Sequence, residues 1–491
     1  MKTFFSSKTK IQAKNFTLLA ATMMVTLTGC ASNNDYLKQS DNLNTYIASA
    51  TIADELKGVS EVNWWQQLND TTLNALVEEA LTQNNALIAS GKRLQAAYRQ
   101  LGYEQHQYLP QGGALVASTK ESVDNVQTES AKAGLGLSWQ LDLFGRIDEL
   151  ISAANANALA QAELQRSLYV EIVSGVVQSY LNWHGSNEKH RIIAMQISAL
   201  EESIEVLKIR VEEGYSSSLD LNRAYAQLNQ QQALLPLVEQ ARFNNQAALA
   251  VLTGRTASDI NIPDTKTVAD ELRTLSQYAK KQFTIDKLRV ELASPSLAIA
   301  KRPDISQALY QLAKEQALSD SARAALFPSI NLTAFAGVLS VDSAGLSNTV
   351  NHWQIKPQVE WSLLSYPALM AQLDTQLLFT EAAYADYKQA VLEAIADSER
   401  SLNRLLTQTQ QHQFATKRFE YANRAFEQAT AMYEEGQVPY LTLLDARQDV
   451  LIAQQNAVDS TVASLISRVE AFKAFNGQWS HALTLLQSNG A

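Results

Sequence analysis

The chain has 491 residues, a formal net charge of -10 at pH 7 and a single cysteine. It contains no basic block, which excludes the positive surface that a nucleic-acid-binding protein needs, and one cysteine cannot form an intramolecular disulfide. Only 9 Pro and 18 Gly occur in the whole chain. This scarcity of helix-breaking residues predicts very long helices.

The first 30 residues predict a lipoprotein signal peptide. Lysines precede the apolar run "FTLLAATMMVTLT" at 16–28, which is too short for a spanning helix. The next residues, "LTGC", resemble a bacterial lipobox. We therefore expect a signal peptide over 1–29, covalent lipid on Cys30 with no other cofactor, and a lipidated tether over 30–71. No aspartate follows the cysteine at the second position, which is typical of sorting to the outer membrane. The alternative is a free thiol in an ordinary signal sequence.

After the tether the chain repeats its own plan, which predicts an internal duplication. A Leu-Pro break at 109–110 has its counterpart at 327–328, and Trp139 lies about 222 residues before Trp361. We therefore expect a first structural repeat over 72–300 and a second over 301–491. Each repeat contains a helix, two strands, a long helix, a reversal and a shorter return helix.

Four segments alternate apolar and polar residues with the two-residue period of a strand. We expect them at 111–119, 132–144, 328–340 and 352–364. Each has the length that a tilted strand needs to cross a bilayer, with one face for lipid and one for water. A half-buried strand of a soluble sheet is the alternative. Four strands cannot close a barrel, so the membrane interpretation requires an oligomer. Known spanning barrels have about eight strands or more, so a dimer is the minimum and a trimer would supply twelve.

Two long segments, 146–213 and 368–435, lack proline and almost lack glycine, and each predicts about 100 Å of helix. Within them, apolar residues recur at spacings of three, four or seven, as coiled-coil packing requires: Leu168, Ile172, Val176 and Tyr180 in the first, and Leu392, Ile395, Leu402 and Leu406 in the second. Whether the first helix kinks near Gly185 is left open. Return helices are expected at 218–253 and 440–475. The irregular segment 254–300 and the C-terminal residues after 475 predict a collar at mid-height.

These features together resemble the TolC-like outer-membrane efflux channel family, specifically its lipid-anchored branch that partners resistance-nodulation-division pumps. The most specific local matches are "LDLFGR" at 141–146, "KRPDI" at 301–305 and "YLTLLDA" at 440–446. The resemblance implies a homotrimer with a twelve-stranded outer-membrane β-barrel, continued by a long periplasmic α-helical barrel. It also implies a periplasmic membrane-fusion adaptor and an inner-membrane pump as partners, with multidrug efflux, metal efflux and type I export all sharing this architecture.

The resemblance also implies a gate at the periplasmic end, where each long helix reverses. By motif match the constriction is made by Leu441 and Asp445, with Asp220 as another acid near the aperture. Three Leu side chains would form an apolar plug, and three carboxylates a ring that selects for cations. Some family members carry a second Asp where this chain has Thr442 and an Arg where it has Val438. A salt-bridge lock built on these positions is therefore not expected here, and the apolar ring is expected to carry more of the gating. The residues expected at the adaptor-docking tips are Gly214, Tyr215, Ser216, Gly436, Gln437 and Val438.

Structural roles at the two tips compete with these functional ones. Ser217 and Asp220 form a capping box, and Pro439 suits the first turn of a helix. Asp445 is also consistent with a solvated surface acid.

No enzyme is predicted, since the six histidines lack metal-site spacing and neither a phosphate loop nor a nucleophile elbow occurs. Two other classes remain open. One is a lipid-anchored coiled-coil scaffold in the periplasm, and the other is a hydrolase with a helical domain.

Overall fold

The computed structural model describes residues 64–123, 126–263, 302–343 and 346–475, all within one compact unit spanning 51–491. The predicted signal peptide, Cys30, most of the tether, and the collar segments after 263 and 475 lie outside these residues. In chain order the main elements are α4 (Thr71–Gln83), α5 (Asn85–His106), β1 (Gln111–Val123), β2 (Val126–Leu141), α6 (Arg146–Glu212), α7 (Ser218–Thr253), α11 (Pro303–Ala324), β3 (Ser329–Ser343), β4 (Leu346–Glu360), α12 (Tyr366–Glu434) and α13 (Tyr440–Phe475).

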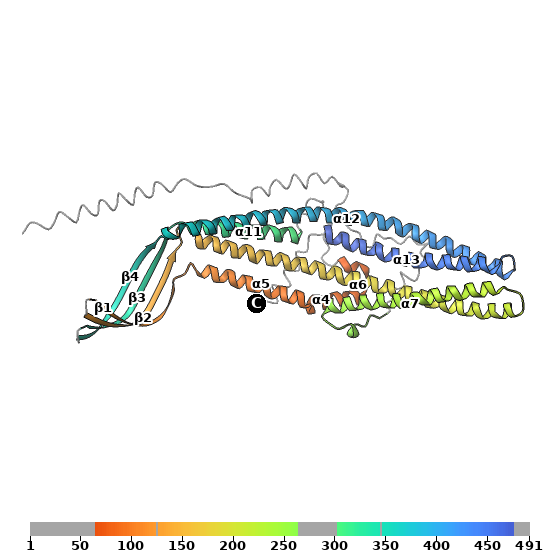
Figure 1. Cartoon of the computed structure of the whole chain (residues 1–491), viewed down its shortest axis with the longest axis horizontal. Coiled ribbons are helices and arrows are strands. Elements are labelled where there is room, and N and C mark those ends of the chain that lie inside the picture. Colours follow the sequence, from red (N-terminus) through yellow and green to blue (C-terminus); the bar gives the residue numbers. More distant parts are fainter. Residues whose placement is uncertain (1–63, 124–125, 264–301, 344–345, 476–491) are drawn as a thin grey trace, which may run out of the picture. The chain divides into compact units, whose positions relative to one another are not determined.

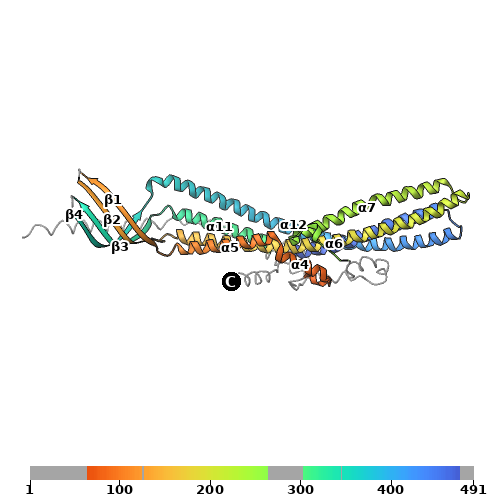
Figure 2. The same cartoon turned by 90° about the horizontal axis from the view of Figure 1, so that it is seen from below.

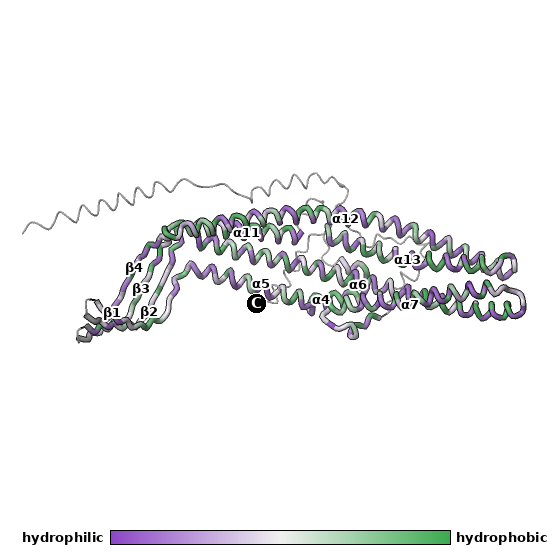
Figure 3. Tube along the Cα trace, viewed as in Figure 1, coloured by the Kyte–Doolittle hydropathy of each residue, from purple (hydrophilic) through white to green (hydrophobic). Residues whose placement is uncertain are grey.

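Within this unit the four strands form one antiparallel sheet in the order β1-β2-β3-β4 at one end of the long helices (Figure 1). The register places Trp139 opposite Leu332, and Leu332 opposite Pro357. Because side chains alternate between the faces of a sheet, the apolar residues of neighbouring strands share one face. Figure 3 shows that hydrophobic and hydrophilic residues are interspersed in the sheet.

The strands extend further toward the hairpin turns than expected. At the first hairpin turn, β1 continues to Val123, beyond the expected 119, and β2 begins at Val126, before the expected 132. At their other ends two strands are shorter than expected: β2 ends at Leu141 and not at 144, and β4 ends at Glu360 and not at 364. The turn-proximal parts are rich in Ser, Thr, Glu and Lys, so apolar alternation did not reveal them. Backbone pairing across each hairpin nevertheless continues through them.

The two helix-to-strand junctions are built in the same way. The indole Nε1 of Trp139 donates to the carbonyl of Tyr108 at 2.9 Å, and the indole Nε1 of Trp361 donates to the carbonyl of Leu326 at 3.1 Å. Each carbonyl lies two residues before the proline that separates the preceding helix from the strand. The duplication seen in the sequence is therefore also a duplication of hydrogen bonding.

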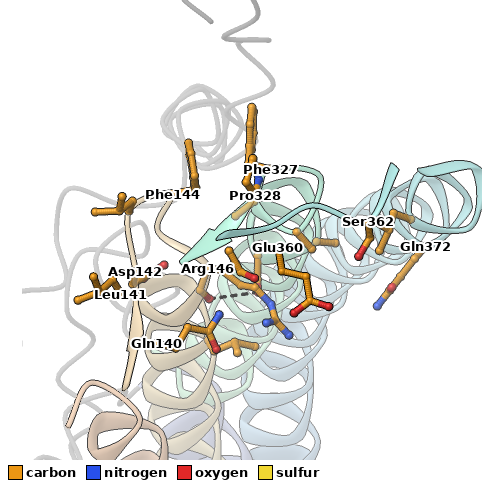
Figure 4. A pocket seen from close by; sticks show the side chains of 18 of the residues that line it. Gln140, Leu141, Asp142, Phe144, Arg146, Phe327, Pro328, Glu360, Ser362 and Gln372 are labelled. Atoms are coloured by element: carbon orange, nitrogen blue, oxygen red, sulfur yellow. Dashed lines mark hydrogen bonds between the residues drawn. The ribbon is translucent and has the colours of Figure 1, made fainter. Parts of the chain in front are cut away.

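The "LDLFGR" motif fixes the start of α6 (Figure 4). Oδ2 of Asp142 accepts the backbone N–H groups of Ile147 and Asp148, both at 2.9 Å. These are donors that the first helical turn leaves without a partner. Phe144 stacks on Phe327 with 5.0 Å between ring centroids. A cavity of about 400 Å³ lies between sheet and helices here; its lining includes Gln140, Arg146, Glu360, Ser362 and Gln372.

The long helices α6 and α12 contain 67 and 69 residues, so each extends about 100 Å. The helix α6 continues through Gly185, where the absence of a side chain allows close packing against α13. A Cβ on Gly185 would lie 2.7 Å from a methyl carbon of Val462. The glycine thus serves a helix contact, and no helix end occurs there.

The main hydrophobic core lies where α4, α6 and α13 meet. Ile172, Val176 and Tyr180 are buried, as their spacing predicts. Trp64, from the segment that precedes α4, stacks on Phe472 of α13 with 5.1 Å between ring centroids. The same cluster includes Leu87 of α5, Leu249 of α7 and Phe419 of α12, so side chains from six helices and the turn at 64–68 form one core.

The coiled-coil pattern expected in the second long helix is partly wrong for the single chain. Leu392 and Leu406 are 54% and 60% exposed, whereas Val391, Ala394 and Ser398 are buried. The buried face of α12 mixes small residues with large ones such as Tyr387 and Phe419, and the leucines at 392 and 406 lie outside it. No helix among the described residues is long and apolar enough to serve as a membrane span.

Candidate functional site

The two helical reversals lie together at the end of the helices opposite the sheet (Figures 1 and 2). We call residues 213–217 the first tip and 435–439 the second tip. Gly214 and Gly436 have φ angles of 79° and 72°, the left-handed conformation that glycine adopts without a steric penalty. This conformation lets each long helix end in a tight turn.

Both tips end their long helix by the same hydrogen-bonding motif. Tyr215 N–H donates to the carbonyl of Arg210 at 2.8 Å, and Gln437 N–H donates to the carbonyl of Met432 at 2.8 Å. In each tip the glycine N–H also donates to a carbonyl three residues back. This is the Schellman arrangement, which satisfies the last carbonyls of a helix.

The return helices begin differently. In the first tip, Ser217 Oγ accepts the backbone N–H of Asp220 at 3.2 Å and donates to its Oδ2 at 2.9 Å. Asp220 is therefore engaged in capping its own helix. In the second tip, Thr442 N–H donates to the carbonyl of Pro439 at 3.0 Å. The carboxylate of Asp220 and the hydroxyl of Ser217 are thus hydrogen-bonded to each other at the start of α7.

A small hydrophobic core holds the two hairpins together near the tips. Leu200, Ile204 and Leu207 of α6 pack in one cluster with Leu443 and Leu444 of α13. All five side chains are less than 9% exposed. The leucine pair of the "YLTLLDA" motif therefore anchors α13 inside the chain.

Leu441 and Asp445 lie on a different face of α13. They are one helical turn apart, the separation at which side chains share a face. Leu441 is half-buried, and both Asp445 and Thr442 are exposed. An apolar side chain and a carboxylate thus lie on the same face of α13, outside the hydrophobic core near the tips of their own chain.

The residues expected to dock the adaptor are accessible to different degrees. Tyr215 is 82% exposed. A Cβ added to either Gly214 or Gly436 would meet no atom within 4 Å. Gly214, Tyr215, Gly436 and Gln437 are exposed, and Ser216 and Val438 are half-buried.

Arg210 and Tyr433, which lie outside the matched motifs, also join the hairpins. The guanidinium of Arg210, on α6, contacts the hydroxyl of Tyr433, on α12, and its Cζ lies 5.2 Å from the centre of that ring. Tyr433 in turn packs edge-on against Tyr440 at 5.5 Å. Burial raises the pKa of Tyr440. Arg210 and Tyr433 are 223 positions apart in the sequence, so no periodic pattern in the sequence could have predicted their contact.

The sequence model for the outer membrane efflux protein family matches residues 76–255 and 294–476. The chain belongs to this family. It is 26% identical over 480 residues to the toluene efflux pump outer membrane protein TtgF of Pseudomonas putida, covering 94% of this chain and 96% of that protein. It is 25% identical over 476 residues to the cation efflux system protein CusC of Escherichia coli, covering 94% of this chain and 98% of that protein.

Solved channels share the fold. The Campylobacter jejuni outer membrane channel CmeC aligns with a TM-score of 0.76 and 21% identity, over 90% of this chain and 95% of that one. The Neisseria gonorrhoeae channel MtrE, solved in an open state, aligns with a TM-score of 0.73 and 23% identity, over 87% of this chain and 96% of that one.

Family membership confirms the predicted class of protein. The chain is an outer-membrane efflux channel that extends into the periplasm, and it is not an enzyme. Its fold is that of the trimeric channels to which four strands per chain contribute, and such channels act with a periplasmic adaptor and an inner-membrane pump. Among the described residues, no three His, Cys, Asp or Glu side chains are placed to hold a metal.

Proposed function

We propose that three copies of this chain form a passive exit duct, closed at rest where the second tips meet. The observation that carries the proposal is the free face of α13, on which Leu441 and Asp445 are one turn apart and outside the tip core. Around a threefold axis, this face would present three leucines and three carboxylates to the aperture. MtrE, a relative in fold, has an open state, which supports a gate of this kind.

Closure of the barrel follows from the sheet edges. β1 and β4 are the edge strands, and an unpaired edge in lipid would leave backbone groups without hydrogen bonds. In our proposal, β1 of each copy pairs with β4 of the next. Twelve strands then enclose one lumen, and the polar face of each sheet lines it.

The other roles that we propose are those predicted from the sequence. We propose lipid attachment at Cys30, a division into repeats at 72–300 and 301–491, and a family-like contribution of Asp220 near the aperture. An adaptor would bind the exposed tips at Gly214, Tyr215, Gly436 and Gln437, with Ser216 and Val438 beside them. The relatives' names include toluene and cation efflux, which fits a duct whose cargo is selected by the pump.

Single-channel recording of the detergent-purified protein in planar bilayers tests the gate. We expect low conductance for the wild type, a larger conductance for Leu441→Ala, and a weaker preference for cations for Asp445→Asn. Thr442→Ala is a matched control, because Thr442 is exposed beside them on α13. Currents that stay unchanged in both variants would remove these residues from the gate.

A further inference from the structure

Arg447 lies two residues after Asp445 on α13 and contacts both neighbouring long helices. Its Nη1 donates to Oγ of Ser203 at 2.8 Å and to the carbonyl of Ala199 at 3.4 Å, both on α6. Its Cζ lies 5.7 Å from the ring centre of Phe426, on α12. One side chain of the gate helix thus bridges the two hairpins.

The partners of this guanidinium are neutral. Among the residues that the structure describes, no carboxylate forms an ion pair with Arg447, and burial lowers its pKa. Arginine nevertheless remains charged in proteins. A partly buried charge is tolerated only where hydrogen bonds replace those lost to water, so Arg447 depends on Ser203 and Ala199 staying in place.

These contacts fix the position of α13 along α6. Apolar side chains such as Leu443 and Leu444 can slide between similar packing arrangements at modest cost, whereas a hydrogen bond from a charged donor requires one register. If α13 moved outward, the guanidinium would lose both acceptors and be hydrated. The arrangement in this structure is the one in which both acceptors on α6 are used.

We propose that Arg447 is a positioning residue for the gate: it holds α13 against α6 in the closed state and thereby keeps Leu441 and Asp445 at the aperture. This inference rests on the proposed function. It adds a connection between the gate helix and the first hairpin. Opening the duct would then require the Arg447–Ser203 contact to break.

Two measurements on the full-length detergent-extracted protein test the proposal. In planar bilayers, Arg447→Met should raise the open probability about tenfold, since hydrogen bonds from charged donors are worth about that factor or more. Methionine keeps a long apolar side chain and removes the donors. Ser203→Ala removes one acceptor, so a smaller rise is expected, and adding it to Arg447→Met should have little further effect.

Hydrogen–deuterium exchange gives a readout independent of current. Arg447→Met should speed exchange in residues 440–450 of α13 and in the facing part of α6 around Ser203. Arg424→Met is the matched control. Arg424 lies on α12 near the same end of the hairpin, is exposed, and pairs with Glu420 of its own helix, so its loss should change neither current nor exchange.

The outcomes separate the inference from the proposed function. If Leu441→Ala changes the current and neither Arg447→Met nor Ser203→Ala does, the inference is overturned and the proposed channel function stands. Unchanged exchange in α13 and α6 after Arg447→Met would overturn it as well. A wild type without channel activity would contradict the proposed function, while exchange would still report whether Arg447 holds α13.

Discussion

The hydroxyl of Tyr180, on α6, donates a hydrogen bond of 2.6 Å to Oδ2 of Asp70, 110 residues earlier in the chain. Both residues are at most 1% exposed. Oδ1 of the same carboxylate caps α4 through the backbone N–H groups of Thr72 and Leu73. This pair therefore ties the start of α4 to the middle of the long helix α6.

Loss of that hydrogen bond should destabilise the protein. For Tyr180→Phe we expect a loss of about 1–3 kcal/mol in the free energy of unfolding, because a buried carboxylate loses a donor. The midpoint of heat-induced unfolding of the detergent-purified protein measures this. Tyr215→Phe is the control, since Tyr215 is exposed, and equal midpoints for the two variants would contradict the prediction.

Alanine should have opposite effects at two glycines that both have open space around them. Gly436 has a positive φ, so Gly436→Ala should destabilise the second tip by about 1 kcal/mol or more. Gly102 lies inside helix α5 without positive φ, so Gly102→Ala should stabilise by about 0.5–1 kcal/mol. Thermal midpoints compare the two variants, and a stabilising Gly436→Ala would refute the left-handed cap.

The contact between Gly185 and Val462 should be sensitive to added volume. Gly185→Ala places a methyl group where a methyl carbon of Val462 already lies, so a loss of about 1–3 kcal/mol is expected from overpacking. The additional change Val462→Ala should restore part of this loss by making room. Denaturation of the two single variants and the double variant gives the coupling, and simple additivity would argue against a direct clash.

Stability should fall in mild acid because of His412. Burial, and then the charge of Arg468, lowers its pKa below the usual value. Its Nδ1 lies 3.3 Å from Oγ1 of Thr461 in the α12–α13 hairpin. A histidine with a lowered native pKa binds its proton more weakly in the native state than in the unfolded chain. Stability is then complete above the unfolded pKa of about 6.5 and decreases as the pH falls from there toward the native pKa.

Thermal midpoints measured from pH 7.5 to pH 5 test this dependence. His412→Gln should flatten the decrease, whereas His106→Gln, at an exposed position near the end of α5, should leave it unchanged. If the thermal midpoint of His412→Gln decreases with falling pH as much as that of the wild type, groups other than His412 cause the decrease.

The sequence by itself determined the elements and the duplication. The absence of proline and the scarcity of glycine specify long helices, and the observed bounds of α6, α7, α12 and α13 lie within two residues of those expected. Gly214 and Gly436 mark the reversals because a left-handed cap requires a residue without a Cβ. These signals depend only on residues that are close together in the sequence, so they can be recognised without the tertiary structure.

Tertiary structure decided which faces of the elements meet. Periodicity could not predict that Leu392 is exposed while Val391 is buried. Both side chains are apolar, and only the position of the neighbouring helix decides which of them is covered. The contacts of Arg447 with Ser203, and of Tyr180 with Asp70, join residues separated by 244 and 110 positions. Such pairs depend on how the hairpins pack in three dimensions, and no spacing in the sequence encodes them.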